Sequence, residues 1–513
     1  MKKSVVSICV ILASFALSLP VSAQYRDEAP KSDVEAILNE AGSAEEPVVI
    51  TLEQALEIAL SENISVKVAD MEIERSEYAK KGSYAALWPQ IDASGAYQRT
   101  IKKQVMYMDF DMSSLGGMLG GGAGEGEGEG TELPDGVELP DGMEIPGGAG
   151  SSTEDKPSSS NGGGMEVGRW NTWSTGVSAA MPLVNAQLWQ SLKISGMDVE
   201  LAVEKARASR LDMVTQVKQA YYSVLLSKQA FDVYKQVYEN AVRNYEETQK
   251  KYDAEKASEM ELIRSKTTVA NAIPNVYNAE SSVILALWQL KAVLGVDLEM
   301  NIDVAGALED YGQQMFYDIH SHDGATLEDN TTMKQLAIQT EQLAQMVKMQ
   351  KFANIPSLAL AFNYSINAMT NDFKFSEYKW TPYSYVGLSL NIPIFAGGKR
   401  YNAIRQSENQ YRQVQLQSLN TERQLKIAIR QHLTTMEMNM KSYYAAQDAV
   451  ASAQKGYDIM EMSYQVGRGT LIELNDAQLA LTQAQLAESQ AIYNFLNAKA
   501  QLEQTLGQDF IVE

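Results

Sequence analysis

Apolar positions along the chain follow two periods, which predict long helices interrupted by short strands. Helical spacing continues through two long stretches, residues 188–251 and 401–465. At about 1.5 Å per residue, each stretch is roughly 95 Å long, far longer than a globular domain needs. Shorter helices are predicted at 52–87, 259–294 and 471–506, and apolar–polar alternation predicts strands at about 90–107, 170–182, 357–367 and 381–393.

This order of segments occurs twice, which indicates an internal duplication. A helix ending at Pro89 has a counterpart of equal length ending at Pro356, and glycines that stop the last helix of each half stand at Gly295 and Gly507. The expected fold is mainly α, with membrane β-strands, built from two helix–strand–strand–helix units. We divide the chain into a first repeat (51–295), a linker (296–325), a second repeat (326–507) and a tail (508–513).

Helix lengths and seams indicate how the helices pack. In the first half, the two shorter helices together are about as long as the long one, so they can stack end to end beside it. The last helix carries two apolar seams on nearly opposite sides, one with Leu481 and Phe495 and the other with Leu496 and Ala500. Seams on two sides predict neighbours on both flanks, as in a wall or tube of helices. The core of an ordinary helical bundle is the alternative.

The strands of the second half place apolar side chains on one face and small or polar side chains on the other. A tilted membrane-spanning strand requires this alternation, although a half-buried sheet in water shows it too. The expected lipid-facing residues are Leu358, Leu360, Phe362, Val386, Leu388 and Leu390. The aromatic residues expected at the membrane interface are Trp170, Trp173, Tyr378, Trp380 and Tyr383.

Four strands are too few to close a barrel, and lipid does not tolerate an open sheet edge. A membrane barrel built from this chain therefore requires oligomerisation. Three chains would supply twelve strands.

The N-terminus has the pattern of an export signal. A basic start, an apolar stretch and the small-residue triplet ending at Ala23 predict that residues 1–23 are removed and that 24–50 begin the exported chain. Cys9, the one cysteine, lies inside that signal, so disulfides are not expected. No run of 18 or more apolar residues follows, which argues against a transmembrane helix.

Charge excludes one class of function. The formal net charge of −22 argues against a nucleic-acid binder, because basic side chains supply the affinity for phosphate backbones. Much of the negative charge lies in a glycine-rich insertion at 108–166, between the first two strands. This insertion is too polar to bury a core. It is either a solvated surface loop or a loop that binds divalent cations or repels anions.

An enzyme is not expected. The chain has three histidines and no phosphate-binding glycine loop, which leaves no nucleophile, base or nucleotide site, and no cofactor is predicted. His320 and His322 could ligate a metal with Asp323, but they fall in the irregular linker, so no metal site is predicted.

The chain resembles the TolC family of outer-membrane efflux proteins over nearly all of Thr51 to Gly507. The motifs that carry the resemblance are Thr51-Leu-Glu-Gln-Ala-Leu-Glu-Ile-Ala-Leu with Asn63, Asn391-Ile-Pro-Ile-Phe-Ala-Gly-Gly-Lys-Arg400 and Tyr464-Gln-Val-Gly-Arg-Gly-Thr-Leu-Ile-Glu-Leu-Asn-Asp-Ala-Gln478. The resemblance implies a homotrimer with a twelve-stranded barrel in the outer membrane and a long helical tube across the periplasm. It also implies a periplasmic adaptor protein and an inner-membrane pump of RND or ABC type as partners, with the channel conducting substrate passively.

Family resemblance also assigns roles to the turns that join each long helix to the following short one, which we call the tip turns. It implies that they dock on the adaptor, through Glu255 and Ala257 in the first half and Gly467 and Gly469 in the second. Since glycine is replaced in the first turn, the two turns are expected to differ in shape or in adaptor contact. The residues matching the family's entrance gate are Glu261, Glu473 and Asp476, with Tyr464 and Arg468 nearby.

The alternative for these acids is that they begin a helix, where negative charge is favoured. For the whole protein, the alternative to an export channel is a non-conducting exported coiled-coil protein used for structure or adhesion. A coiled-coil spacer does not need the duplicated strand pair, which favours the channel. Its substrate, whether small toxic molecules or polypeptides of type I secretion, stays open.

Overall fold

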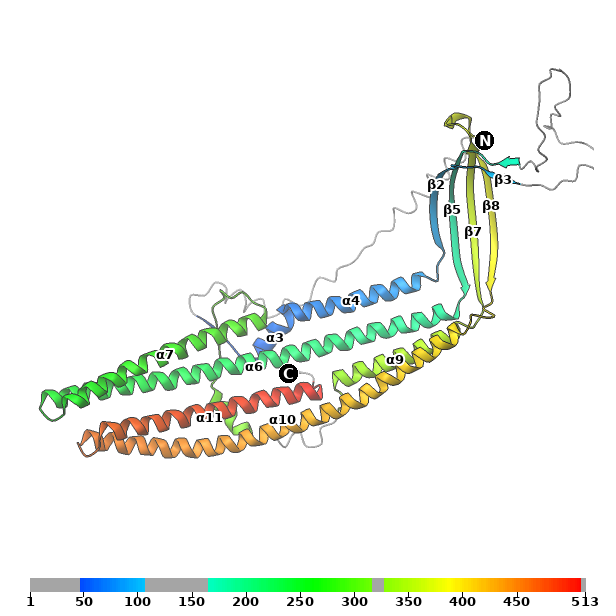
Figure 1. The fold of residues 1–513 in the computed structure, drawn as a ribbon. Helices are drawn as coiled ribbons and strands as arrows, with labels where there is room; N and C mark the ends of the chain where they lie inside the picture. Colours follow the sequence, from blue (N-terminus) through cyan, green and yellow to red (C-terminus); the bar gives the residue numbers. More distant parts are fainter. Residues whose placement is uncertain (1–46, 107–164, 316–326, 509–513) are drawn as a thin grey trace, which may run out of the picture. The chain divides into compact units, whose positions relative to one another are not determined.

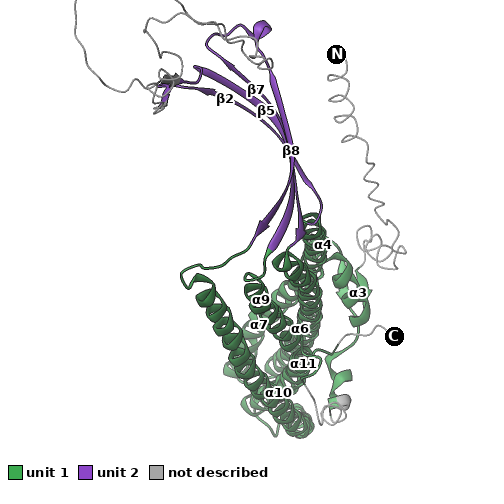
Figure 2. Ribbon diagram, turned by 90° about the vertical axis from the view of Figure 1, so that its right-hand side faces the viewer, with its two compact units in different colours: residues 1–86, 185–356, 392–513 green, residues 87–184, 357–391 purple. Residues whose placement is uncertain are grey.

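The computed structural model describes residues 47–106, 165–315 and 327–508 (Figure 1). The predicted signal peptide, most of the acidic insertion, the two linker histidines and the last five residues lie outside these ranges. The chain forms two compact units (Figure 2). One is helical and comprises residues 1–86, 185–356 and 392–513, and the other carries the main sheet and comprises 87–184 and 357–391.

The helical unit contains a long helix and shorter helices from each half of the chain. The first half supplies α3 (Leu52–Glu62), α4 (Ile64–Ala85), α6 (Ala186–Asp253) and α7 (Glu259–Leu294). The second half supplies α9 (Thr331–Phe352), α10 (Lys399–Gln465) and α11 (Leu471–Leu506). A short parallel pair, β1 (Val48–Ile50) with β6 (Ile302–Val304), and the 3₁₀ helix η1 (Leu308–Gln314) complete the unit. No helix in the described ranges combines the length and the apolar character that crossing a bilayer requires.

The prediction of one continuous helix over residues 52–87 is wrong. The chain turns at Asn63, which has extended backbone angles (φ −64°, ψ 131°), so α3 and α4 are separate helices. The Asn63 side chain causes this break, because its Oδ1 accepts the Ser65 N–H at 2.7 Å and caps α4. A short polar side chain that bonds the backbone locally favours a helix start over a helix interior.

The predicted stacking of short helices beside a long one is confirmed. Asn63 Nδ2 donates to the Val293 carbonyl in the last turn of α7 at 2.7 Å, so the end of α7 meets the start of α4. Both helices pack against α6. The second half repeats the junction, with Asn330 Nδ2 donating to the Thr505 carbonyl at 2.6 Å, where α11 meets α9.

A hydrophobic core lies where α3, α6 and α11 meet the small parallel sheet. Phe495 of α11 and Leu56 of α3 are fully buried there. Tyr221 of α6 donates its hydroxyl to the Ala305 carbonyl at 2.7 Å, and burial raises its pKa to about 12. Helix α11 contacts both α10 and α6, as its two seams predict.

The second unit is a four-stranded antiparallel sheet in the order β2-β5-β7-β8. Its strands are β2 (Gln90–Arg99), β5 (Asn171–Val184), β7 (Ser357–Thr370) and β8 (Thr381–Asn391). Beyond β2 the chain forms β3 (Gln104–Met106), which pairs with β4 (Met165–Val167), and η2 (Phe375–Glu377) lies between β7 and β8. The mainly helical fold class with long helices and four antiparallel strands is confirmed.

Candidate functional site: a sheet face and two helical tips

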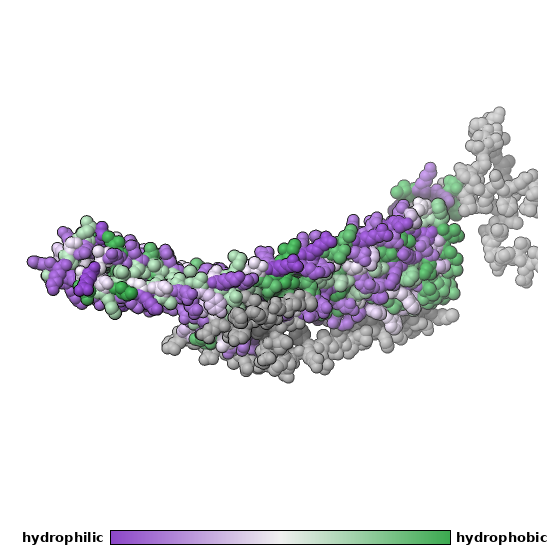
Figure 3. Space-filling view, turned by 90° about the horizontal axis from the view of Figure 1, so that it is seen from below, coloured by the Kyte–Doolittle hydropathy of each residue, from purple (hydrophilic) through white to green (hydrophobic). Residues whose placement is uncertain are grey.

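The sheet has one apolar face that continues across all four strands. Register pairs Leu358 with Leu390, Leu360 with Leu388 and Phe362 with Val386, so the six residues predicted to face lipid share one side. The same side receives Ile91 of β2 and Val177 of β5. Val386 and Leu388 of β8 are about two-thirds exposed (69% and 67%), and apolar side chains gather over this sheet (Figure 3).

The opposite face of the sheet is small and polar. Ala361 pairs there with Gly387, and Ala359 pairs with Ser389. Gly176 of β5 packs tightly on this side, because a Cβ at that position would lie 2.6 Å from the Tyr364 carbonyl oxygen. The sequence pattern of β7 and β8 therefore extends to the whole sheet.

Aromatic side chains cluster at the end of the sheet where β2 stops and β7 connects to β8. Tyr97 and Trp173 stack with ring centroids 4.3 Å apart, and Phe375 and Tyr378 continue the cluster at 5.0 Å steps. Of the five predicted interface aromatics, Trp173, Tyr378 and Trp380 belong to it. Trp170 instead lies under the Lys103 ammonium, and Tyr383 contacts Tyr385.

The two tip turns share a left-handed residue and a hydrogen-bonding motif, and the second turn has a further bond from the Gly469 N–H to the Ser463 carbonyl at 2.9 Å. Glu255 has a left-handed φ of 57°, and Gly467 at the matching position has 77°. The next N–H in each turn, from Lys256 or Arg468, bonds a carbonyl five residues back, which defines a Schellman motif. The hydrogen-bonded turn holds Glu255 in a conformation that glycine adopts more easily.

Two of the gate acids are helix caps. Glu261 accepts the Ser258 N–H at 2.9 Å, and Glu473 accepts the Thr470 N–H at the same distance, forming a capping box at the start of α7 and of α11. The Thr470 N–H, and then its hydroxyl, hold the pKa of Glu473 below its ordinary value. The structure thus gives both acids a structural role that the sequence offered as the alternative, and it leaves Asp476 exposed on α11.

Tyr464 joins the two helical hairpins within the chain. Its buried hydroxyl shares a hydrogen bond with the Thr248 hydroxyl of α6, and Lys251 Nζ donates to the Tyr464 carbonyl at 2.6 Å while lying 4.0 Å from the ring centroid. Burial raises the pKa of this phenol, and the bond from Thr248 opposes the rise. Along the same interface, Asn240 Nδ2 donates to Gln478 Oε1 at 2.9 Å.

Sequence reasoning missed Thr248, Lys251 and Asn240. The signal for Asn240 and Thr248 is a set of polar residues four apart on one face of a long helix, Asn240, Asn244 and Thr248, all of which the fold buries. Arg468, by contrast, is exposed in its turn, with no carboxylate within 4.0 Å among the residues that the structure describes.

Comparison with known proteins identifies relatives over most of the chain. The model of the family described as outer membrane efflux protein matches residues 145–296 and 324–508. Outer membrane protein TolC of Escherichia coli K12 is 20% identical over 353 residues, which cover 66% of this chain and 70% of that protein. TolC of Vibrio cholerae is 19% identical over 336 residues, covering 65% and 76%.

Solved structures share the fold. The Campylobacter jejuni CmeC outer membrane channel superposes with a TM-score of 0.62 at 16% identity, covering 91% of each chain. VceC from Vibrio cholerae gives 0.61 at 15% identity, covering 89% of this chain and 96% of that one.

Long helical hairpins combined with a four-stranded sheet that has one apolar face define an outer-membrane channel protein. The chain belongs to the outer membrane efflux protein family, the family of TolC. It is a transport protein of the outer membrane and not an enzyme. Membership of this family supports the export channel and argues against the non-conducting coiled-coil alternative.

Proposed function

We propose that three copies of the chain form one conduit, with their strands closing into a twelve-stranded sheet in the outer membrane and their helices forming a periplasmic tube. The apolar face that continues in register across all four strands carries this proposal. A sheet with such a face buries it in lipid, while the small, polar face lines an aqueous path. Edge strands β2 and β8 have no further partner in the described chain, and pairing between copies satisfies their backbone groups.

The conduit works with a periplasmic adaptor and an inner-membrane pump of RND or ABC type, which supplies the energy, so that the chain conducts substrate passively. The adaptor docks on the tip turns through Glu255, Ala257, Gly467 and Gly469. The left-handed residue and Schellman motif that the two turns share support this, since a trimer then presents six similar turns to a repeating partner.

Acidic residues at the tips select cations at the entrance. In a trimer Glu261, Glu473 and Asp476 each become a ring of three, and rings of carboxylates favour cations at a constriction. Tyr464 and Arg468 complete the gate: Tyr464 holds the hairpins together, and the exposed Arg468 is placed to bond a neighbouring copy.

Planar-bilayer conductance in asymmetric salt tests this function. We expect discrete, cation-selective openings from the purified trimer. The variants Glu473→Gln and Asp476→Asn remove charge, and Gln retains an oxygen that can cap α11, so selectivity should fall while the fold persists. Glu280→Gln, at an exposed acid on α7, is the matched control. An unchanged reversal potential in both tip variants would remove the gate assignment, and a bilayer that stays silent with both would contradict the channel.

A further inference from the structure

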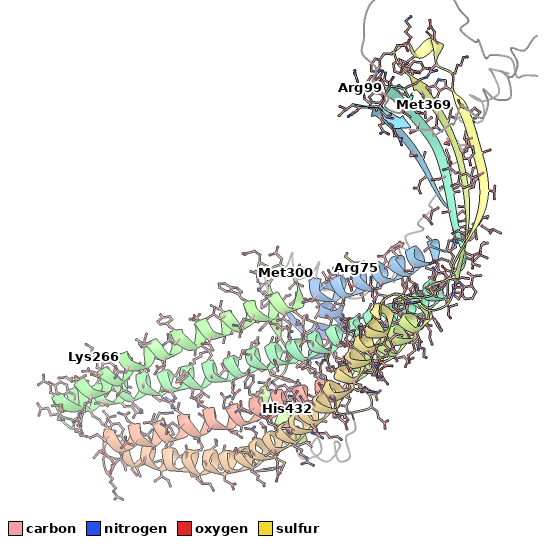
Figure 4. All side chains as sticks on the ribbon, turned by 45° about the vertical axis from the view of Figure 1, so that its right-hand side comes forward. Arg75, Arg99, Lys266, Met300, Met369 and His432 are labelled. Carbon is pink, nitrogen blue, oxygen red and sulfur yellow. The ribbon has the colours of Figure 1, made fainter. Side chains whose placement is uncertain are left out.

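Basic side chains of the sheet unit gather at one end of the sheet. All six basic residues in the described part of this unit lie where β2 stops and β7 connects to β8. Figure 4 shows Arg99 at this end. Five of the six are exposed and one, Lys103, is half-buried. We call this set the basic collar, and its members are Arg99, Lys102, Lys103, Arg169, Lys374 and Lys379.

The basic collar has no counter-ion among the side chains that the structure describes. Every ion pair found among them belongs to the helical unit. Two collar residues lie over aromatic rings instead, with Arg99 Cζ 6.0 Å from the Phe373 centroid and Lys103 Nζ 4.8 Å from the Trp170 centroid. A ring orients a cation and leaves its N–H donors available. The collar therefore presents donors and positive charge to a ligand.

Exposed aromatic rings lie beside the collar on the apolar side of the sheet. Tyr97 pairs with Trp173, and strand alternation places both on the same face as Val177. The connection between β7 and β8 adds Phe373, 6.3 Å from the Tyr97 centroid, and Phe375, 5.0 Å from the Trp173 centroid. Phe373 and Phe375 are 52% and 56% exposed, so most of each ring can contact a ligand.

The β7–β8 connection holds these rings in place through its own hydrogen bonds. The Asp372 carbonyl accepts the Thr370 hydroxyl at 2.9 Å, the Tyr378 hydroxyl at 2.8 Å and Asn171 Nδ2 at 3.3 Å. Three donors from different parts of the unit therefore fix the backbone between Thr370 and Phe373. A surface ordered in advance binds without a further entropic cost of ordering.

Spacing along β7 places the collar at a membrane boundary. From Leu358 to Ala368 the strand advances ten residues, which at about 3.3 Å each is roughly 33 Å. At a tilt of about 40° this is roughly 25 Å along the membrane normal, the height of the apolar band of membrane sheets. Ala368 pairs with Trp173 of the aromatic cluster. The rings and the collar thus lie where the hydrocarbon ends and lipid headgroups begin.

We propose that the basic collar binds phosphate groups of lipid headgroups in the outer leaflet, while Phe373 and Phe375 contact the adjoining acyl chains. This inference rests on the conduit proposed above, in which this end of the sheet reaches the outer surface of the membrane. Arginine can hold a phosphate through two N–H donors, and lysine adds charge. Because exposed rings adjoin the cations, the ligand is a lipid and not a free phosphate ion.

Two lipids that differ only in their phosphate test this site. Native mass spectrometry counts the molecules of phosphatidic acid, or of diacylglycerol with the same acyl chains, that the purified trimer retains in a nonionic detergent. We expect phosphatidic acid to bind roughly tenfold more tightly or better, since each basic residue at an anionic surface contributes about fivefold. Inorganic phosphate should not displace it, and displacement would replace the lipid site with a site for free phosphate.

The double variant Arg99→Gln with Lys103→Gln should lose roughly tenfold or more in affinity for phosphatidic acid and keep its affinity for diacylglycerol. Arg99→Lys with Lys103→Arg retains both charges and should bind like the parent. The matched control is Arg264→Gln with Lys266→Gln, which removes an exposed arginine and an exposed lysine from α7 (Figure 4). It should leave the binding of both lipids unchanged.

Outcomes separate this site from the function on which it rests. Equal binding of the two lipids by an intact trimer, or unchanged affinity in the glutamine variant of the collar, would overturn the site and leave the conduit standing. Absence of a trimer would contradict the proposed function itself. A preference for phosphatidic acid that emerges only after deletion of Gly116 to Gly164 would show that the acidic insertion neutralises the collar, which would also overturn the site.

Discussion

At the scale of single residues, the tip turns show how hydrogen bonds hold a side chain in an unfavourable backbone conformation. Glu255 has a positive φ, which L-residues avoid because Cβ approaches the following carbonyl oxygen. Its N–H donates to the Tyr252 carbonyl at 2.8 Å, and the Lys256 N–H donates to the Lys251 carbonyl at 2.7 Å. These bonds maintain the turn that glycine forms at Gly467.

Replacing Glu255 with glycine should stabilise the first turn by about 1 kcal/mol, because the strain at Cβ disappears. Hydrogen exchange of the Lys256 amide measures this, and a slowing of about fivefold corresponds to that energy. Glu255→Ala removes the charge and keeps the strain, so its exchange should stay close to that of the parent. Equal slowing in both variants would assign the effect to charge.

The capping box of α11 should weaken in acid. The folded pKa of Glu473 is lowered, so its contribution to stability is present above the unfolded value of about 4.3 and is lost as pH falls through the folded value. We expect the protection factor of the Thr470 amide to fall between about pH 5 and pH 3. In Glu473→Gln this pH dependence should vanish, and its persistence would place the titrating group elsewhere.

At the scale of elements, the junctions between stacked helices depend on glycine at close approach. Gly295 and Gly507 both have left-handed φ. A Cβ at Gly295 would lie 3.0 Å from Asn63 Cα, and a Cβ at Gly507 would overlap the Asp329 carbonyl oxygen. Arg207 of α6 ties the second junction together by donating to the Gly507 carbonyl at 2.8 Å and to the Asp329 carbonyl at 3.2 Å.

Gly507→Ala should therefore destabilise the protein more than Gly295→Ala. In each variant the left-handed backbone lowers the free energy of unfolding by about 1–2 kcal/mol. Gly507→Ala should lower it further, because the new Cβ must displace the Asp329 carbonyl. The apparent melting temperature of the helical signal measures the difference. Gly82→Ala, in an exposed part of α4 with nothing within 4 Å, should be neutral or stabilising. A reversed order would mean that the second junction relaxes.

The two faces of the sheet should differ in whether they tolerate a charged side chain. Leu388 lies on the apolar face and Ser389 on the polar face of the same strand. Leu388→Arg should reduce the yield of assembled protein in membranes, since arginine facing lipid costs about 2–4 kcal/mol near the bilayer centre. Ser389→Arg is the matched control and should assemble normally while altering ion conductance. Equal assembly of the two variants would contradict lipid contact on this face.

At the scale of the whole molecule, four passages of the chain connect the helical unit and the sheet unit, at residues 86–87, 184–185, 356–357 and 391–392. The acidic insertion lies in the connection between β2 and β5. These two strands pair through ten residues, none of which belongs to the insertion. We therefore expect the proposed assembly to depend on that pairing and on the helical core.

Deleting Gly116 to Gly164 should leave the trimer intact, because the insertion has too few apolar residues to contribute a core. Size-exclusion chromatography with light scattering measures the mass of the assembly. A scrambled insertion of equal composition serves as the control for length and charge. Loss of the trimer on deletion alone would show that the insertion stabilises the assembly.

The sequence alone determined the features that local patterns encode. The period of the apolar positions indicated which segments are helices and which are strands. The internal duplication indicated the order of these elements in each half. The glycines after α7 and α11 indicated where those helices end. Alternation along β7 and β8 also predicted the apolar face. These features depend on neighbours a few residues away, so the printed sequence contains them.

Only the tertiary structure decided the contacts between distant residues. It placed Thr248 and Lys251 on Tyr464, and it divided the predicted first helix at Asn63, whose side chain bonds the end of α7. Bonds such as Thr248 to Tyr464 join residues more than two hundred positions apart. Which polar groups meet there depends on how the helices pack, because a buried donor or acceptor must find its partner wherever packing brings one.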